Sequence, residues 1–132
     1  MKKKIYDEIS FILDDKGSIY MYGKNNGKQT FETIYNELGE INPSIKIDGK
    51  NFVADCNKLT NKDIRNKYFG RVNAYFIFNV DSILNDKKAL DYLFELVENE
   101  DCFFIMLGTN SLLDYNEDVW SGLSFLDEIC VD

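Results

Sequence analysis

Two short apolar runs constrain the fold of this 132-residue chain more than any other feature. Residues 74–78 read Ala-Tyr-Phe-Ile-Phe, and residues 102–107 read Cys-Phe-Phe-Ile-Met-Leu. A strand that is apolar on both faces fits the middle of a parallel sheet that helices cover on each side. Segments with helical spacing alternate with such strands along the chain. This order predicts a doubly wound α/β sheet.

The other elements are predicted from apolar spacing and from residues that begin or end helices. Thr60 with Asp63 resembles a capping pair, and Asp86 is placed to cap the helix that follows it. In chain order we expect an N-terminal helix marked by Ile5, Ile9, Ile12 and Leu13, a strand at 19–22, a helix at 31–38, an extended piece at 44–47, a strand at 51–56, helices at 60–68 and 86–97, and a final strand at 126–131.

A glycine loop joins the predicted strand at 19–22 to the helix that follows. This layout is that of a phosphate-binding P-loop, in which backbone amides and the helix N-terminus face an anion. The P-loop pattern needs four residues between its first Gly and Gly-Lys, then Ser or Thr. Here three residues separate Gly23 from Gly27, and Gln29 follows Lys28. The candidate residues of a vestigial nucleotide site in this loop are Gly23, Asn25, Asn26, Gly27, Lys28, Gln29 and Thr30.

Two further strand ends carry polar residues. Asn79-Val80-Asp81 follows the first apolar run, and Gly108-Thr109-Asn110 follows the second. Ligands of open α/β sheets bind beyond the carboxyl ends of the strands. Asn79 and Asn110 therefore join the candidate nucleotide site.

Charge is divided unevenly along the chain. All 15 Lys and Arg lie in residues 1–88, whereas residues 89–132 contain 11 acids and no base. This acidic part cannot supply the phosphate contacts that dominate nucleic-acid affinity, which argues against direct nucleic-acid binding. The chain has no His, so the usual general base is missing.

The remaining composition indicates a cytoplasmic globular protein. No apolar run approaches the roughly 20 residues of a membrane span, and Asp7 and Glu8 interrupt what would be the core of a signal peptide. Cys56, Cys102 and Cys130 lie far apart, next to apolar runs and without metal-ligand spacing. We expect buried thiols and no metal site.

The three strand ends, in this order, resemble the AAA+ ATPase core of the bacterial replication initiator DnaA. In that family a strand ending in Tyr-Gly precedes the P-loop, and here residues 19–23 read Ile-Tyr-Met-Tyr-Gly. Residues 72–84 look like its Walker B region, and residues 105–110, Ile-Met-Leu-Gly-Thr-Asn, look like its sensor 1 strand. The resemblance implies one truncated DnaA-like core over residues 1–132, without lid or DNA-binding domain. Its fold would be three-layered and P-loop NTPase-like, with a mostly parallel sheet of about five strands in the order 5-1-4-3-2.

Matched to the family, several chemical groups are replaced. Lys28 falls on the Walker A lysine and Asn110 on the sensor 1 polar residue, but Gln29 stands where a hydroxyl binds magnesium. Asn79 falls on the metal-binding Walker B aspartate, and Val80 on the acid that polarises water. The family's arginine finger and sensor 2 arginine would lie in the part of the chain that has no Arg.

The resemblance therefore implies a catalytically inactive DnaA-like domain that binds a protein partner in replication initiation or its regulation. No cofactor is expected, and ATP or ADP is the candidate ligand if the loop still binds one. The alternative is a divergent adenine-nucleotide-binding switch or ATPase that a partner completes. A receiver-like signalling domain fits less well, since the paired acids and acceptor aspartate are missing. Tyr115, Trp120 and Phe125 form an apolar group among acids that would suit either the core or a partner surface.

Overall fold

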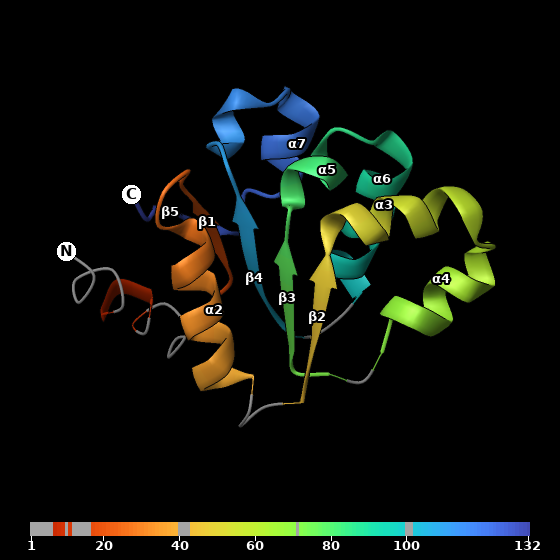
Figure 1. Ribbon diagram of the computed structural model, residues 1–132. Helices are drawn as coiled ribbons and strands as arrows, with labels where there is room; N and C mark the ends of the chain where they lie inside the picture. The colour runs from red at the N-terminus through yellow and green to blue at the C-terminus, as the bar shows by residue number, and fades with distance from the viewer. Residues whose placement is uncertain (1–6, 10, 12–16, 40–42, 71, 100–101) are drawn as a thin grey trace.

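The computed structural model describes residues 7–9, 11, 17–39, 43–70, 72–99 and 102–132. Its centre is a five-stranded sheet in which every neighbouring pair is parallel, in the order β2-β3-β4-β1-β5 (Figure 1). The strands are β1 (Ile19–Tyr22), β2 (Ser44–Asp48), β3 (Ala74–Phe78), β4 (Phe103–Gly108) and β5 (Asp127–Cys130). The predicted order 5-1-4-3-2 is the same arrangement read from the other edge, so it is confirmed.

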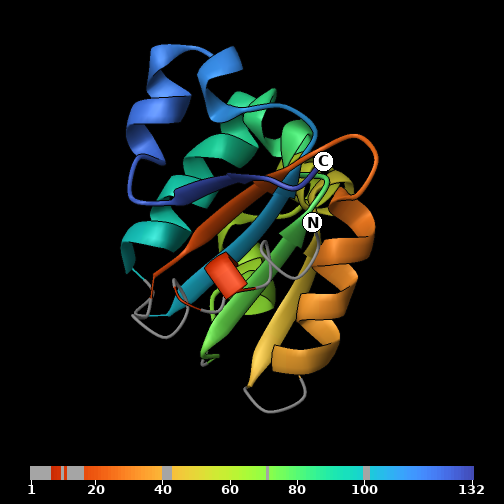
Figure 2. The same ribbon diagram turned by 90° about the vertical axis from the view of Figure 1, so that its left-hand side faces the viewer.

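Helices cover both faces of the sheet. They are α2 (Gly27–Leu38), α3 (Gly49–Lys58), α4 (Asn61–Tyr68), α5 (Val80–Leu84), α6 (Lys87–Asn99) and α7 (Glu117–Gly122), with a 3-10 turn η1 (Leu112–Asp114). Figure 2 shows α2 on one face of the sheet and the teal and blue helices, α6 and α7, on the other. The three-layer α/β architecture predicted from the alternation of strands and helices is therefore present.

Each face of the sheet has its own core, because side chains alternate along the strands. Along β3, Tyr75 and Ile77 belong to the core beneath α3 to α7, whereas Ala74 and Phe76 belong to the core beneath α2. The Tyr75 and Phe104 rings stack across β3 and β4 with centroids 5.2 Å apart. The central strands are thus buried on both sides, as their unbroken apolar sequence predicts.

Two predicted helix starts are confirmed by observed side-chain caps, whereas the helix predicted at 31–38 begins earlier, at Gly27. The Thr60 hydroxyl accepts a hydrogen bond from the Asp63 amide at 3.2 Å, at the start of α4. The Asp86 carboxylate accepts one from the Ala89 amide at 3.0 Å, at the start of α6. In the N-terminal helix, Ile9 is buried in the α2-side core; Ile5, Ile12 and Leu13 lie outside the described residues.

The predicted strand at 51–56 is wrong, because these residues form α3. The Asp48 carboxylate accepts a hydrogen bond from the Lys50 amide at 3.0 Å and caps this helix. Phe52 and Cys56, four residues apart, are its buried apolar positions. A short apolar run cannot by itself distinguish a strand from a buried helix, and here the position beside β3 is already occupied by β2. Neither α5 nor α7 was predicted.

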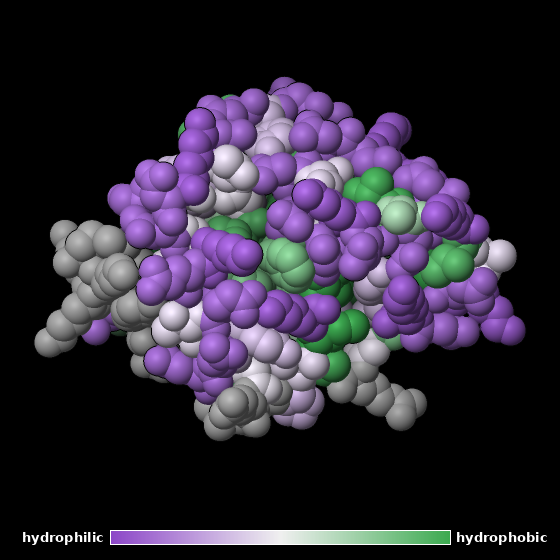
Figure 3. Space-filling model, in the orientation of Figure 1, coloured by the Kyte–Doolittle hydropathy of each residue, from purple (hydrophilic) through white to green (hydrophobic). Residues whose placement is uncertain are grey.

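The expectation that all three thiols are buried is correct only for Cys56. Cys102 is half-buried, and Cys130 is exposed on the edge strand β5, where its side chain alternates outward. No helix in the described part of the chain is long and apolar enough to cross a membrane. The surface viewed in Figure 1 is mainly hydrophilic, with hydrophobic side chains in small separate patches (Figure 3).

One ion pair between α3 and α4 predicts a pH dependence of stability. Lys67 Nζ lies 2.7 Å from Asp55 Oδ2, and the Tyr68 hydroxyl donates to the same oxygen. The hydrogen bonds from Lys67 and then Tyr68 lower the pKa of Asp55. A carboxyl whose pKa is lower in the folded state stabilises the fold above its unfolded pKa, and this contribution is lost as the pH falls through the folded value.

We therefore expect Asp55→Asn to be less stable than the native chain at pH 7 and to lose this difference below about pH 4. Urea unfolding at pH 7 and pH 3 measures the effect. Glu37→Gln, at an exposed carboxylate on α2, is the control and should leave stability nearly unchanged. If Asp55→Asn lowered the free energy of unfolding equally at both pH values, the negative charge of Asp55 would not be the source of the stabilisation.

Candidate functional site

The glycine loop between β1 and α2 wraps around a carboxylate from the same chain. Three successive amides donate to the side chain of Asp132: Lys24 to Oδ2 at 2.7 Å, Asn25 to Oδ1 at 3.0 Å, and Asn26 to Oδ1 at 2.8 Å. These hydrogen bonds, with that from Asn26 contributing most, lower the pKa of Asp132. Successive amides that converge in this way form an anion-binding nest. The nest holds the carboxylate as an anion.

The two glycines of the loop are explained by close packing. A Cβ on Gly23 would lie 2.6 Å from Asp132 Oδ1 and 3.1 Å from Val131 Cγ2. A Cβ on Gly27 would lie 2.8 Å from Leu107 Cδ1 at the end of β4. Neither glycine has a positive φ. A side chain at position 23 would therefore have to displace the Asp132 carboxylate from its place in the loop.

Lys28 and Asn79 lie at the same place in the structure, but the space between them is small. They line a cavity of about 180 Å³ with Phe31, Glu32, Phe78 and Leu107. Small-molecule sites usually have volumes of about 300–1,000 Å³. Gln29 is exposed, and Thr30 is buried with its amide bonded to the Asn26 carbonyl at 3.0 Å. This cavity is too small for a whole nucleotide.

Asn79 has a structural partner at the neighbouring strand end. Its side-chain amide donates to Asp48 Oδ1 at 2.9 Å, the oxygen that also caps α3. Its backbone is left-handed, with φ 53°, a conformation that Asn tolerates better than most residues. Val80, the next residue, is fully buried. The Asn79 side chain therefore links the end of β3 to the end of β2.

Asp81 binds the loop that follows β4. Its Oδ2 accepts hydrogen bonds from the Thr109 amide and hydroxyl, each at 2.9 Å. Its Oδ1 accepts one from the Tyr115 hydroxyl at 2.5 Å. Burial and then this hydrogen bond raise the pKa of Tyr115. The Tyr115 side chain is thus held by Asp81 at the strand ends, whereas Trp120 and Phe125 are exposed at the surface. The three aromatic residues therefore do not form a single cluster.

Asn110 lies apart from the small cavity that Lys28 and Asn79 share. Its backbone carbonyl accepts a hydrogen bond from the Tyr20 hydroxyl at 2.7 Å. A Cβ on Gly108 would lie 2.0 Å from that hydroxyl, so glycine is needed for the Tyr20 side chain to pass the end of β4. Burial raises the pKa of Tyr20. The nine predicted site residues thus fall into three places: the loop around Asp132, the small cavity, and the end of β4.

Two groups at the strand ends were missed by sequence reasoning. Asp48 directly follows the extended piece predicted at 44–47, and an Asp before a helix start is a capping signal. Asp132 carried no local signal at all, because its partners lie 106 to 108 residues earlier in the chain. Among the described residues, no group of three or more acids or cysteines is placed to hold a metal ion.

The parallel sheet with β1 between β4 and β5, and the glycine loop leading into α2, define an α/β fold of the P-loop NTPase type. Two solved structures share it. A structure described as a DNA replication initiation factor superposes with a TM-score of 0.81 at 13% identity, over 99% of this chain and 46% of that one. AMPPCP-bound DnaA from Aquifex aeolicus gives a TM-score of 0.76, also at 13% identity, over 99% of this chain and 46% of that chain.

The predicted resemblance to DnaA is therefore confirmed as a likeness of fold. The chain spans less than half the length of these two structures. No known protein family matches the sequence, and no curated protein matches it at a significant level.

Proposed function

We propose that this chain is a DnaA-like domain that does not turn over ATP and acts by binding a protein partner in the cytoplasm. Replication initiation or its regulation is the process proposed, by analogy with the two structures described above. An analogy of fold does not by itself carry function, so the proposal depends on the strand-end chemistry.

The observation that carries the proposal is the Asp132 carboxylate in the nest of the glycine loop. The amides of residues 24–26 point at this carboxylate at 2.7 to 3.0 Å. A phosphate group would need the same donors, and it carries the same sign of charge as Asp132. Nucleotide binding would therefore require Asp132 to leave.

The groups needed for hydrolysis are also replaced. Phosphoryl transfer depends on a bound metal, a positioned water and added positive charge, of which an arginine finger alone contributes about 10³ to 10⁵ in rate. Asn79 is bonded to Asp48, Val80 is buried, and residues 89–132 contain no Arg. These replacements support the proposal that the domain retains the fold of a DnaA-like ATPase but does not hydrolyse ATP.

A protein partner is supported by apolar side chains at the surface. Leu113, Trp120 and Phe125 are large and exposed, and all three lie between β4 and β5 among acids. Exposed Trp and Phe are more typical of protein interfaces than of other surfaces. The acids beside them disfavour nucleic acid, whose backbone is itself anionic.

Isothermal titration with ATP and ADP in the presence of Mg²⁺ tests this proposal. We expect no saturable heat at millimolar nucleotide and no phosphate release above the buffer rate, with Lys28→Ala identical to the native chain. Lys62→Ala, at an exposed lysine of α4, is the matched control. Turnover that Lys28→Ala abolishes and Lys62→Ala retains would refute the proposal.

The second candidate is a nucleotide-binding switch or ATPase that a partner completes. The one observation in its favour is that Lys28 and Asn79 line the same cavity, although at about 180 Å³ this cavity would have to widen to admit a nucleotide. Under this alternative the native chain binds ATP with micromolar affinity, and Lys28→Ala removes the binding.

A further inference from the structure

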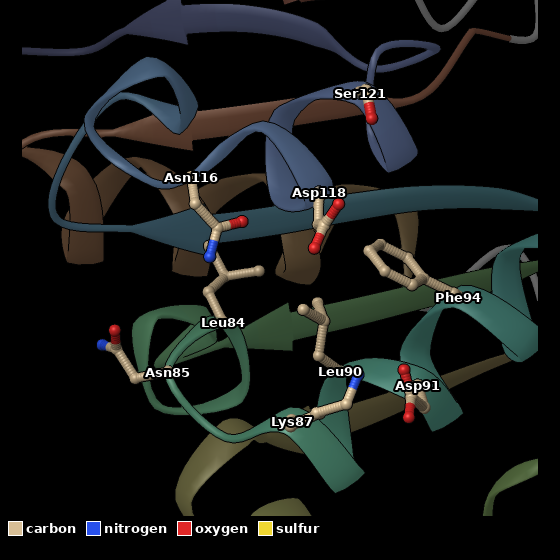
Figure 4. A pocket seen from close by; sticks show the side chains of 9 residues that line it. All are labelled: Leu84, Asn85, Lys87, Leu90, Asp91, Phe94, Asn116, Asp118 and Ser121. Atoms are coloured by element: carbon tan, nitrogen blue, oxygen red, sulfur yellow. The ribbon is translucent and has the colours of Figure 1, made fainter.

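A groove lies on the α6 and α7 side of the sheet, on the opposite side from α2. Its volume is about 400 Å³, within the range of about 300–1,000 Å³ that ligand sites occupy. Figure 4 shows the side chains that line it, which come from the end of α5, from α6 and from α7. The lining residues are Leu84, Asn85, Lys87, Leu90, Asp91, Phe94, Asn116, Asp118 and Ser121.

Three of the nine residues that line the groove are apolar, and all three belong to the core or pack against it. Leu84 and Leu90 are buried members of the core, and Phe94 packs against it. A Cβ on Gly122 would lie 2.6 Å from Phe94 Cε1, so α7 packs directly on that ring. The groove is therefore a fixed feature between two helices that both contact the core.

The rim of the groove is acidic. Asp91 of α6 and Asp118 of α7 stand on opposite sides, with Leu90 and Phe94 between them (Figure 4). No salt bridge within the described part of the chain joins either carboxylate to a base. Lys87 is the one base among the described lining residues, and Glu117 adds a further exposed acid next to Asp118.

We infer that this groove binds a basic amphipathic segment of a protein partner. An apolar side chain of the segment packs on Leu90 and Phe94, while flanking Lys or Arg side chains pair with Asp91 and Asp118. Apolar centres with charged rims are the usual anatomy of such interfaces, and charge complementarity selects the partner. This inference rests on the proposed protein-binding function and names the chemistry of the partner.

The chain's own charge distribution favours this occupant over others. Residues 89–132, which supply α7 and most of α6, hold 11 acids and no base, so an acidic peptide or a nucleic acid meets repulsion there. A basic segment gains long-range attraction that decreases with salt. A second copy of this chain, with a net charge of −8, is disfavoured for the same reason.

The test uses a fluorescent amphipathic helical peptide of Leu and Lys, a version with Glu in place of Lys, and polarisation at two salt concentrations. We expect the full chain to bind the Lys peptide and not the Glu peptide, more weakly at high salt. The double variant Asp91→Asn/Asp118→Asn should weaken binding at least tenfold. The control variant Asp114→Asn/Asp127→Asn removes the same charge at exposed positions outside the groove and should change binding less than twofold.

A second variant separates shape from charge. Ser121→Trp fills the groove from an exposed position of α7 and should also abolish binding, while circular dichroism verifies the fold. The inference would be overturned if the two charge variants had equal effects or if Ser121→Trp bound as well as the native chain. It would also be overturned if the chain preferred the Glu peptide or did not bind the Lys peptide. Nucleotide titration reports on the proposed loss of ATP turnover independently, so failure of the groove and failure of the proposed function give different results.

Discussion

Replacing Asp132 by alanine is expected to create binding of inorganic tripolyphosphate where the native chain shows none. The amides of Lys24, Asn25 and Asn26 lose their carboxylate acceptor in the variant and become available to another anion. Lys28, at the first turn of α2, adds a positive charge nearby. Isothermal titration should give saturable binding for Asp132→Ala and no saturable heat for the native chain, with ATP behaving like tripolyphosphate.

Two comparisons make this result specific. Asp127→Ala removes an exposed acid of β5 and should bind no better than the native chain. Adding Lys28→Ala to Asp132→Ala should reverse most of the gain. If Asp132→Ala is folded and also shows no binding, the glycine loop fails to bind phosphate for a reason other than the presence of the Asp132 carboxylate. If the native chain binds as tightly as the variant, Asp132 is not a competitor.

Gly49→Ala is expected to be the most destabilising small substitution at the strand ends. A Cβ at position 49 would lie 2.1 Å from the Asn79 carbonyl oxygen and 2.9 Å from that of Phe78. Both neighbours are backbone atoms, so β3 and the start of α3 must separate. Overpacking of this kind costs about 1–3 kcal/mol, and we expect the upper end of that range, with a melting temperature roughly 10 °C lower.

Gly70→Ala is the matched control, because a Cβ there meets no atom within 4 Å. Its stability should change by less than about 1 kcal/mol, with a gain as the expected direction, since alanine restricts the unfolded chain. Thermal and urea unfolding of both variants measures the contrast. Similar stabilities for Gly49→Ala and Gly70→Ala would show that the start of α3 and the end of β3 do not approach as closely as the structure places them.

The parts of the fold that sequence could predict are those fixed by local pattern. Unbroken apolar runs identify β3 and β4 as central strands because only a strand covered on both faces can bury every side chain. Thr60 and Asp86 mark helix starts because a side-chain oxygen satisfies an amide two or three residues ahead. The run Phe52-Val53-Ala54 was wrongly predicted as a strand because its length and composition suit a strand and a buried helix equally. In the structure it is helical, and β2 occupies the position beside β3 in the sheet.

The candidate site likewise has features that the sequence predicts and contacts that it does not. The sequence alone determined that a glycine loop leads into a helix, that Asn79 directly follows the central strand β3, and that no arginine follows residue 88. Only the tertiary structure decided what these groups contact. Parallel strands bring their carboxyl ends to one edge whatever their separation along the chain, so Asp48 reaches Asn79 across 31 residues and Asp132 reaches the glycine loop across more than 100. Local periodicity carries no information about such pairs, because strand order and register set them.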